Sequence, residues 1–572
     1  MDIKIIDNGF DYQAGLLKRS IAERIPVIFS EQGMCIELEV DDTLGAIESY
    51  MICEEENGWK IIGADKAGLV YGIGKFLHTA KWSESNFTPN PPIGVISPAC
   101  SFRTIYFSVH FYNWYQMAPI EKLERYLEEM LLWGYNTVLS IVPCINPNSY
   151  EDQLYKDSVE RCKMLFSIAK KIGLKTYTGL APNQGLKTAP HEFDADLSFD
   201  PTGKIRPHIG RNLCPSNPKA LEYLKTVWHA SLDPFQEIGL DYISLWPYDE
   251  GGCWCEDCRP WGAKGFGDVC IAFHNEMKPL FPNAKYLACT WLFDVPEDYG
   301  EYAGFYERLN GDLSWLDYLI IDAHTDYPRY PLEHEVIKPI VNFPEISMWE
   351  LFPWGGLGAN PLPERFQKIW DSSKKILDGG LPYSEGIFED ISKIQFVGYY
   401  WEPDRHWRDI LAEYINYEFE GDVSEEVLEM MSCIEKNHVL AGNWQEPELS
   451  YALRAVQLAE KVNATLGERA KNCWRWRILY IRAVLDWKRY VYYKEHNMSG
   501  RDELFDLKNY HGAMLIEDEE AQNMYKELRK LYHCIDYCEE NRWTLPPVNG
   551  DTTRGGMTYF EKLAKKRAEN KQ

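Results

Sequence analysis

The chain has 572 residues, of which 45% are hydrophobic and 14% are aromatic. Its 60 lysines and arginines against 87 aspartates and glutamates give a formal net charge of −27. That balance argues against nucleic acid or an anionic membrane as a partner, because both are polyanions. The sequence contains no run of about 18 apolar residues, so we expect no membrane span. The length is sufficient for two to four domains with a large core.

The sequence begins MDIKIIDNGFDYQAG, which lacks the apolar core and small-residue cleavage site of a secretion signal. We therefore expect a cytoplasmic protein. In that reducing compartment the 15 cysteines indicate buried thiols or a metal site rather than a disulfide framework.

Residues 1–97 predict a small α/β domain. Short runs rich in β-branched residues favour strands at residues 3–6, 27–29, 35–40, 49–53 and 59–64. A helix is predicted over residues 65–77, with Asp65 as its N-terminal cap. The proline-rich stretch 88–92 then predicts a linker.

Residues 98–400 alternate between strand-like and helical patterns, as repeated βα units do. Strands are predicted near residues 104–109, 137–142, 175–179, 242–246, 286–291, 318–321, 346–349 and 383–387. Helices are predicted between them, at residues 119–133, 158–172, 218–238 and 269–280. Eight βα units predict a (β/α)8 TIM barrel. A doubly wound sheet is the alternative, but no glycine-rich phosphate loop follows the first strand.

Residues 401–572 predict an α-helical domain. Helical periodicity is found over residues 424–437, 446–466, 468–496 and 517–540. A helical domain in this place supports the barrel or forms the contact of a homodimer, and the sequence leaves both interpretations open.

The segment 241–258, DYISLWPYDEGGCWCEDC, is the most informative part of the chain. Its apolar beginning predicts a buried strand, which is followed by Asp249 and Glu250. Acidic side chains at the carboxyl ends of barrel strands are typical of catalytic sites. Further acids follow the later predicted strands, at Asp322, Glu350, Glu385 and Asp390.

Carboxyl groups that face one another across a barrel rim predict glycoside hydrolysis. One group protonates the leaving oxygen, and the other acts as nucleophile or activates water. Apolar neighbours raise the pKa of the proton donor, and aromatic rings bind the apolar faces of sugars. The predicted substrate contacts at strand ends are Trp291, His324, Trp349 and Trp354.

The N-terminal domain has a helix that reads GADKAGLVYGI, and the barrel opens with SFRT. This arrangement resembles glycoside hydrolases that carry a hexosaminidase-type domain before a TIM barrel, in particular the family 67 α-glucuronidases, which also have a helical C-terminal domain. The resemblance implies an inverting, exo-acting enzyme on oligosaccharide fragments. It implies Glu250 as the acid, and Asp322 with Glu350 as the groups that activate water. Glu385 is a further candidate for the base.

A second resemblance is to the family 20 β-N-acetylhexosaminidases, and it implies a retaining, substrate-assisted mechanism. Glu250 again protonates the leaving group, whereas Asp249 orients the acetamide of the substrate. Arg103 and His110 are then expected to bind sugar hydroxyls. A third interpretation is a non-catalytic carbohydrate-binding protein with the same aromatic rim. All three take an oligosaccharide or glycoside as partner, and none requires a cofactor for catalysis.

The acid pair is followed directly by Cys253, Cys255 and Cys258 in the spacing C-x-C-x2-C, and Cys214 follows the third predicted strand. Loops of adjacent βα units emerge side by side, so Cys214 is expected as the fourth ligand of a tetrahedral structural zinc site. Four thiolates fill the coordination sphere, so such an ion braces the loop of Glu250 and does not activate water. The alternative is a set of reduced cysteines packed beneath that loop.

Overall fold

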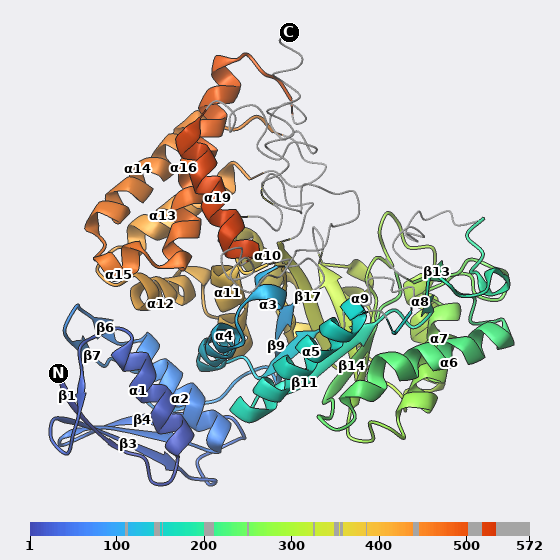
Figure 1. Cartoon of the computed structure of the whole chain (residues 1–572), viewed down its shortest axis with the longest axis horizontal. Coiled ribbons are helices and arrows are strands. Elements are labelled where there is room, and N and C mark those ends of the chain that lie inside the picture. The colour runs from blue at the N-terminus through green and yellow to red at the C-terminus, as the bar shows by residue number, and fades with distance from the viewer. Residues whose placement is uncertain are drawn as a thin grey trace.

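The computed structural model describes residues 1–108, 113–141, 149–151, 153–198, 211–248, 251–323, 327–347, 354, 358–384, 386–438, 445–500 and 518–533. It has an N-terminal α/β part, a barrel and a C-terminal helical part. The N-terminal part and the C-terminal helices lie on the same side of the barrel, one above the other (Figure 1).

The N-terminal part is a six-stranded sheet with the order β2-β1-β3-β5-β4-β8. Its strands are β1 (Asp2–Ile6), β2 (Ile28–Phe29), β3 (Met34–Val40), β4 (Tyr50–Glu55), β5 (Gly58–Gly63) and β8 (Val95–Ile96). Helices α1 (Asp11–Ala22) and α2 (Lys66–His78) accompany the sheet, and a short pair, β6 (Lys81–Trp82) and β7 (Phe87–Thr88), follows α2. Asp65 caps α2 as predicted, because its carboxylate accepts a hydrogen bond of 2.7 Å from the Gly68 N–H.

In the described part of the chain, eight parallel strands close into a barrel, since the last strand pairs with the first. They are β9 (Phe102–Phe107), β10 (Thr137–Ser140), β11 (Lys175–Leu180), β14 (Tyr242–Leu245), β15 (Lys285–Cys289), β16 (Tyr318–Ala323), β17 (Ile340–Ser347) and β18 (Leu377–Gly380). The predicted TIM barrel is therefore confirmed.

Helices cover the outside of the barrel (Figure 1). They are α3 (Trp114–Met117), α4 (Ile120–Leu132), α5 (Gln153–Ile172), α6 (Pro218–Leu232), α7 (Gly265–Met277), α8 (Glu301–Gly311), α9 (Arg329–Glu333), α10 (Pro363–Ser373) and α11 (Asp390–Trp401). Helix α4 has leucine, tyrosine and methionine on one face, which is buried, as expected of an amphipathic helix on a sheet. A short pair, β12 (Gln184–Gly185) and β13 (Arg211–Asn212), follows β11.

Two layers of aromatic rings fill the barrel. The lower layer consists of Phe102, Tyr177, Tyr242 and Tyr318, with ring centroids 5.0 to 6.3 Å apart. The upper layer consists of Tyr106, Trp246, Phe343 and Tyr383, with ring centroids 4.9 to 6.0 Å apart. These contacts identify which face of each strand points inward.

Two predicted strands are displaced. The seventh strand, β17, begins at residue 340 and not at 346, because Pro344 and Glu345 interrupt the apolar run that the prediction relied on. The eighth, β18, has the sequence LDGG, and two glycines give it little strand propensity. Of the predicted segment 383–387, the described residues form β19 (Tyr383–Ser384), which pairs with the end of β17.

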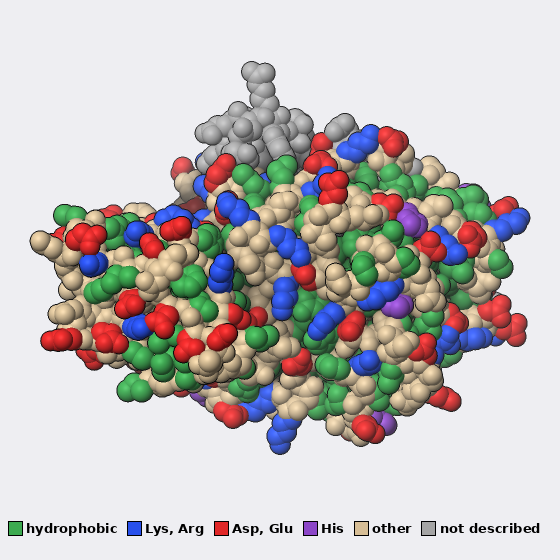
Figure 2. Space-filling view, turned by 90° about the horizontal axis from the view of Figure 1, so that it is seen from below, with side chains coloured by type: hydrophobic (Ala, Val, Ile, Leu, Met, Phe, Trp, Pro, Cys, Tyr) green, Lys and Arg blue, Asp and Glu red, His purple; other side chains and the backbone are tan. Residues whose placement is uncertain are grey.

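The C-terminal part consists of packed helices, as predicted. They are α12 (Trp407–Phe419), α13 (Ser424–Lys436), α14 (Leu449–Thr465), α15 (Glu468–Lys471), α16 (Trp474–Glu495) and α19 (Glu519–His533). Helix α14 contacts both α13 and α16. No helix among the described residues is long and apolar enough to cross a membrane. On the face shown in Figure 2, acidic and basic side chains are interspersed.

A buried group of charges, which we call the junction, joins the three parts of the chain. Arg475 of α16 binds Asp390 of α11 at 2.7 Å and Glu129 of α4 at 2.6 Å. Glu418 of α12 lies 3.7 Å from Arg475 and 3.5 Å from Arg24, which follows α1. Asp390 is fully buried and also accepts hydrogen bonds of 2.8 Å from two tyrosine hydroxyls.

A second buried ion pair joins the N-terminal sheet domain to the C-terminal helices. Glu413 of α12 lies 2.8 Å from the ammonium group of Lys75 on α2, and it also pairs with Arg405. Burial alone would raise the pKa of the Glu413 carboxyl, but the charges of Lys75 and Arg405 lower it to about 2. The folded protein therefore holds this carboxylate in its charged form.

Candidate active site

The candidate site lies at the carboxyl ends of the barrel strands. Several predicted site residues fall outside the described residues, namely Asp249, Glu250, Glu350, Glu385, His110, His324 and Trp349. Their roles stay predictions. The described part of the rim contains Asp322, Trp291 and the neighbours of the acid pair on both sides.

Asp322 on β16 and Glu345 on β17 are carboxylates that point into the barrel. Tyr318 and Phe343 lie in the aromatic layers, and side chains alternate along a strand, so Asp322 and Glu345 share the inward face. Asp322 pairs with Phe343 in the sheet register, which places Glu345 slightly nearer the rim. Both are almost fully buried, with 1% and 2% of their surfaces exposed.

Glu345 is the site residue that the sequence analysis missed. The predicted seventh strand begins at residue 346, so the prediction leaves Glu345 outside any strand. In the structure the Trp291 indole N–H donates to the Glu345 carboxylate at 3.3 Å. Trp291 follows β15 and is 9% exposed, so its predicted contact with substrate stays a prediction. Residues 340–347 read IVNFPEIS and show no regular alternation, so no local pattern identifies Glu345 as an inward-facing acid.

Asp322 is surrounded by groups that stay protonated at neutral pH. Burial raises the pKa of the Cys289 thiol well above its ordinary value, and the charge of Asp322 raises it further. The same two causes act on the pKa of the Tyr302 and Tyr327 hydroxyls. The described surroundings of Asp322 therefore include three neutral polar groups whose pKa values its negative charge raises.

The chain is fixed on the N-terminal side of the acid pair. The Trp261 indole N–H donates to the Pro247 carbonyl at 2.6 Å. The Tyr248 hydroxyl donates to the Glu301 carboxylate, which also accepts a 2.8 Å hydrogen bond from the Gly262 N–H. Tyr248 is 1% exposed, so these contacts are shielded from water.

The chain is also fixed on the C-terminal side, by Asn183. The Asn183 carbonyl oxygen accepts from the Gly252 N–H at 3.0 Å, and its amide nitrogen donates to the Gly252 carbonyl at 2.9 Å. The same amide nitrogen donates to the Leu213 carbonyl at 2.9 Å. Gly252 has φ +126°, a conformation that favours glycine. One buried side chain thus connects the loops that precede Cys214 and Cys253.

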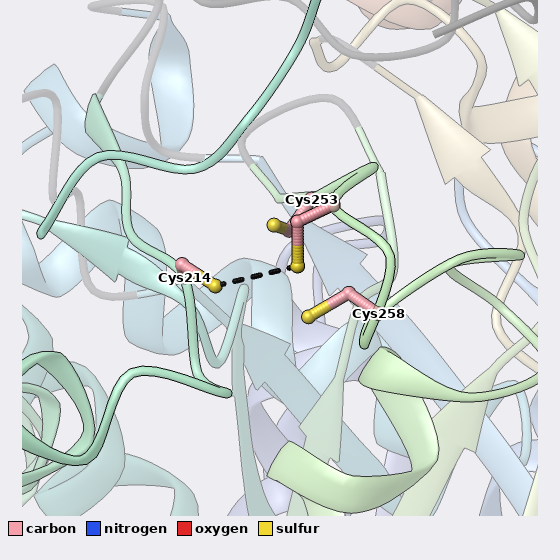
Figure 3. Close-up of side chains that lie close together, drawn as sticks. Cys214, Cys253 and Cys258 are labelled. Carbon is pink, nitrogen blue, oxygen red and sulfur yellow. Dashed lines mark hydrogen bonds between the residues drawn. The ribbon is translucent and has the colours of Figure 1, made fainter. Parts of the chain in front are cut away.

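The four cysteines predicted to lie together do so. The sulfur atoms of Cys214, Cys253, Cys255 and Cys258 all lie within 4.8 Å of one another. The Cys214 and Cys255 sulfurs are 3.6 Å apart. Figure 3 shows Cys214 approaching from one loop, and Cys253 and Cys258 from the other. All four are free thiols that face a common centre, so the residues fit a tetrahedral thiolate site.

Arg103 does not lie where its predicted role requires. It is fully buried near the start of β9, at the end of the barrel opposite the candidate site. Its guanidinium donates to the Cys100 and Gly134 carbonyls at 2.7 Å and to the Glu48 carboxylate at 2.6 Å. The predicted contact with sugar hydroxyls is therefore wrong, and Arg103 joins the N-terminal domain to the barrel.

Trp354 and Asp390 are core residues. Trp354 is fully buried, and its indole N–H donates to the Asp486 carboxylate of α16 at 2.8 Å. The Arg482 guanidinium lies 5.3 Å from the centre of its ring. The prediction of Trp354 as a surface for sugar stacking is therefore wrong. Asp390, expected at the rim, is instead the first residue of α11 and belongs to the junction.

No family model matches the sequence, and no curated protein matches it. Solved structures do match. A glycoside hydrolase of family 89 from Clostridium perfringens, in complex with its substrate GlcNAc-alpha-1,4-galactose, superposes with a TM-score of 0.58 at 12% identity, over 92% of this chain and 66% of that one. A family 138 enzyme targeting pectin rhamnogalacturonan II gives a TM-score of 0.53 at 11% identity, over 93% of this chain and 74% of that one. CpGH84B gives 0.53 at 12% identity, over 92% and 93%.

At these identities the likeness establishes the fold alone. It extends over more than nine tenths of the chain, and so includes the N-terminal part and the C-terminal helices as well as the barrel. The resemblances to family 67 and to family 20 stay predictions. The chain shares its barrel fold, with the parts on either side of the barrel, with these solved structures.

Proposed function

We propose that this chain is a glycoside hydrolase that acts on the ends of oligosaccharides. The observation that carries the proposal is the pair of inward carboxylates, Asp322 and Glu345, at the rim that also receives the Glu250 loop. Structures that share the fold act on sugars: one has GlcNAc-alpha-1,4-galactose as its substrate, and another targets pectin rhamnogalacturonan II. The barrel filled with aromatic rings below the rim supports a site that is open at one end only.

In the proposed mechanism Glu250 protonates the glycosidic oxygen. The chain is anchored on both sides of the acid pair, at Tyr248 and at Gly252. Tyr248 and Trp254 are buried neighbours in sequence, and an apolar environment raises the pKa of a carboxylic acid toward the range a proton donor needs. Glu250 is therefore the residue on which both catalytic interpretations agree.

The group that activates water would come from the other side of the rim. Strand β14 precedes Glu250, and β16 carries Asp322, with β15 between them. Two strand spacings amount to about 10 Å between backbones. A separation of this order is compatible with the roughly 6.5–9.5 Å between the carboxyl groups of inverting enzymes, which leaves room for a water molecule. We infer inversion, with Asp322 as base and Glu345 or Glu350 as its partner.

A substrate-assisted mechanism is the second candidate, since the family 89 neighbour acts on an N-acetylglucosaminide. Asp249 would then orient the acetamide group, and the product would retain the anomeric configuration. A carbohydrate-binding protein without activity is the third candidate. These candidates differ in what the protein releases, so product analysis separates them.

The experiment is a screen of aryl α- and β-glycosides, including uronides and N-acetylhexosaminides, followed by nuclear magnetic resonance of the first-formed anomer. We expect turnover with inversion; retention would favour the acetamide mechanism. Glu250→Gln should lower kcat by about 100-fold or more, and Glu345→Gln should also lower it. The control Glu256→Gln changes an exposed acid on the same loop and should leave kcat unchanged. Absence of turnover on every glycoside would refute the proposal.

A further inference from the structure

The cysteine cluster, defined as Cys214, Cys253, Cys255 and Cys258, has the dimensions of a metal site. Zinc–sulfur bonds of about 2.3 Å place the four sulfurs of a tetrahedral site about 3.8 Å from one another. The measured 3.6 Å between Cys214 and Cys255, and the limit of 4.8 Å for every pair, agree with that geometry. A disulfide needs only about 2 Å between two sulfurs and gives no reason for four to converge.

Hydrogen-bonding groups lie beside the sulfur atoms of the cluster. The Ser216 hydroxyl lies 2.9 Å from the Cys214 sulfur and 3.5 Å from the Cys255 sulfur. The Ser216 backbone N–H also faces Cys214, and the Cys255 N–H faces the sulfur of Cys253. Groups of this kind orient the ligands of metal sites.

The burial of the cluster points to a structural ion. Cys253 and Cys258 are 0% and 1% exposed, and the other two are half-buried. Four thiolates leave no open coordination position for water or substrate. Soft thiolate ligands in a tetrahedron select zinc or iron over magnesium or calcium.

We propose that the cysteine cluster binds one Zn²⁺ ion that fastens two rim loops to each other. One loop runs from β13 to α6 and carries Cys214, and the other directly follows residues 249–250. Asn183 bridges the residues just before Cys214 and Cys253, so the metal and the amide hold the same two loops. The zinc site itself does not depend on the proposed glycosidase activity. Only its consequence for Glu250 rests on that function.

The first test is the metal content of the full chain, purified without chelator. We expect one zinc ion per chain by elemental mass spectrometry, and a loss of most of it in the double variant Cys214→Ser/Cys255→Ser. The matched control Cys270→Ser removes a fully buried thiol of α7 outside the cluster and should retain the zinc. Iron in place of zinc, or equal zinc in the double variant, would overturn the assignment.

The second test does not require any variant to fold. The wild-type chain is stripped of metal by a chelator and alkylated with iodoacetamide, with and without added zinc. We expect zinc to protect Cys214 and Cys255, whereas Cys35 and Cys53, which are also half-buried, react equally in both samples. Cobalt added to the stripped chain should give the intense visible absorption of a tetrahedral thiolate site. Equal labelling with and without zinc, or disulfides within the cluster, would exclude the site whether or not the chain hydrolyses a glycoside.

Discussion

Asn183 is the residue whose removal tests the rim most directly. Its fully buried side chain makes three hydrogen bonds to the backbone of two other loops, at 2.9 to 3.0 Å. The change Asn183→Ala removes all three and leaves the Gly252 N–H and two carbonyls without these partners. Each bond contributes about 1 kcal/mol net, so the local free energy of opening should fall by about 3 kcal/mol.

That loss has a measurable consequence in hydrogen exchange. A decrease of about 3 kcal/mol corresponds to roughly 100-fold faster exchange of the amides that the bonds protect. We expect it by mass spectrometry in peptides that span residues 247–258, with kcat reduced more than KM is raised. The control Asn437→Ala removes a buried asparagine that bridges the same kind of backbone groups in the helical part, at 2.9 and 3.0 Å to Glu448. It should leave exchange at the rim unchanged. Equal exchange of residues 247–258 in wild type and Asn183→Ala would refute the reasoning.

Two further predictions concern the ionic contacts between the parts. Asp390→Asn removes one of the three carboxylates around the buried Arg475, while Glu129 remains at 2.6 Å, and should cost about 3 kcal/mol in the free energy of unfolding. Asp404→Asn changes a 94% exposed acid and should cost less than about 1 kcal/mol. A similar loss in both would contradict the role of the junction. Because its two basic partners lower the pKa of Glu413 from 4.5 to about 2, this carboxyl contributes stability that is complete above pH 4.5 and is lost as the pH falls through 2. Glu413→Gln should therefore be about 3 kcal/mol less stable at neutral pH and equal to wild type near pH 2, measured as melting temperature against pH; a constant difference would disprove the assignment.

Much of the fold follows from patterns within single segments. Six of the eight barrel strands lie where β-branched and aromatic runs predict them. The N-terminal cap of α2 was predicted from Asp65 alone. The strand β18 could not be predicted from its own sequence, because its two glycines are required by neighbours that are distant in sequence. A Cβ on Gly379 would collide with the backbone of Phe102, and one on Gly380 with Asn342. Such constraints exist only once the barrel is closed.

The candidate site was predictable where it depends only on which barrel loops are neighbours. Adjacent barrel loops explain why Cys214 meets the other three cysteines, and this grouping was expected from topology. The predictions for Arg103 and Trp354 were wrong because residue type and order along the chain do not show where a side chain points. They do not reveal at which end of a strand it lies, or whether it faces the core or the solvent. Glu345 was missed because the predicted strand begins at residue 346, whereas β17 begins at residue 340 and includes it.

The junction bears on how this chain can change over generations. Arg24, Asp390, Glu418 and Arg475 come from three parts of the polypeptide, yet each has its counter-charge in another part. A recombination or truncation that removed one end of the gene would leave the remaining parts with buried charges and no counter-ion, which is among the costliest defects in a folded protein. We therefore expect homologous proteins to contain all three parts. Differences in substrate between homologues should lie in the rim loops, which contribute no residue to the junction.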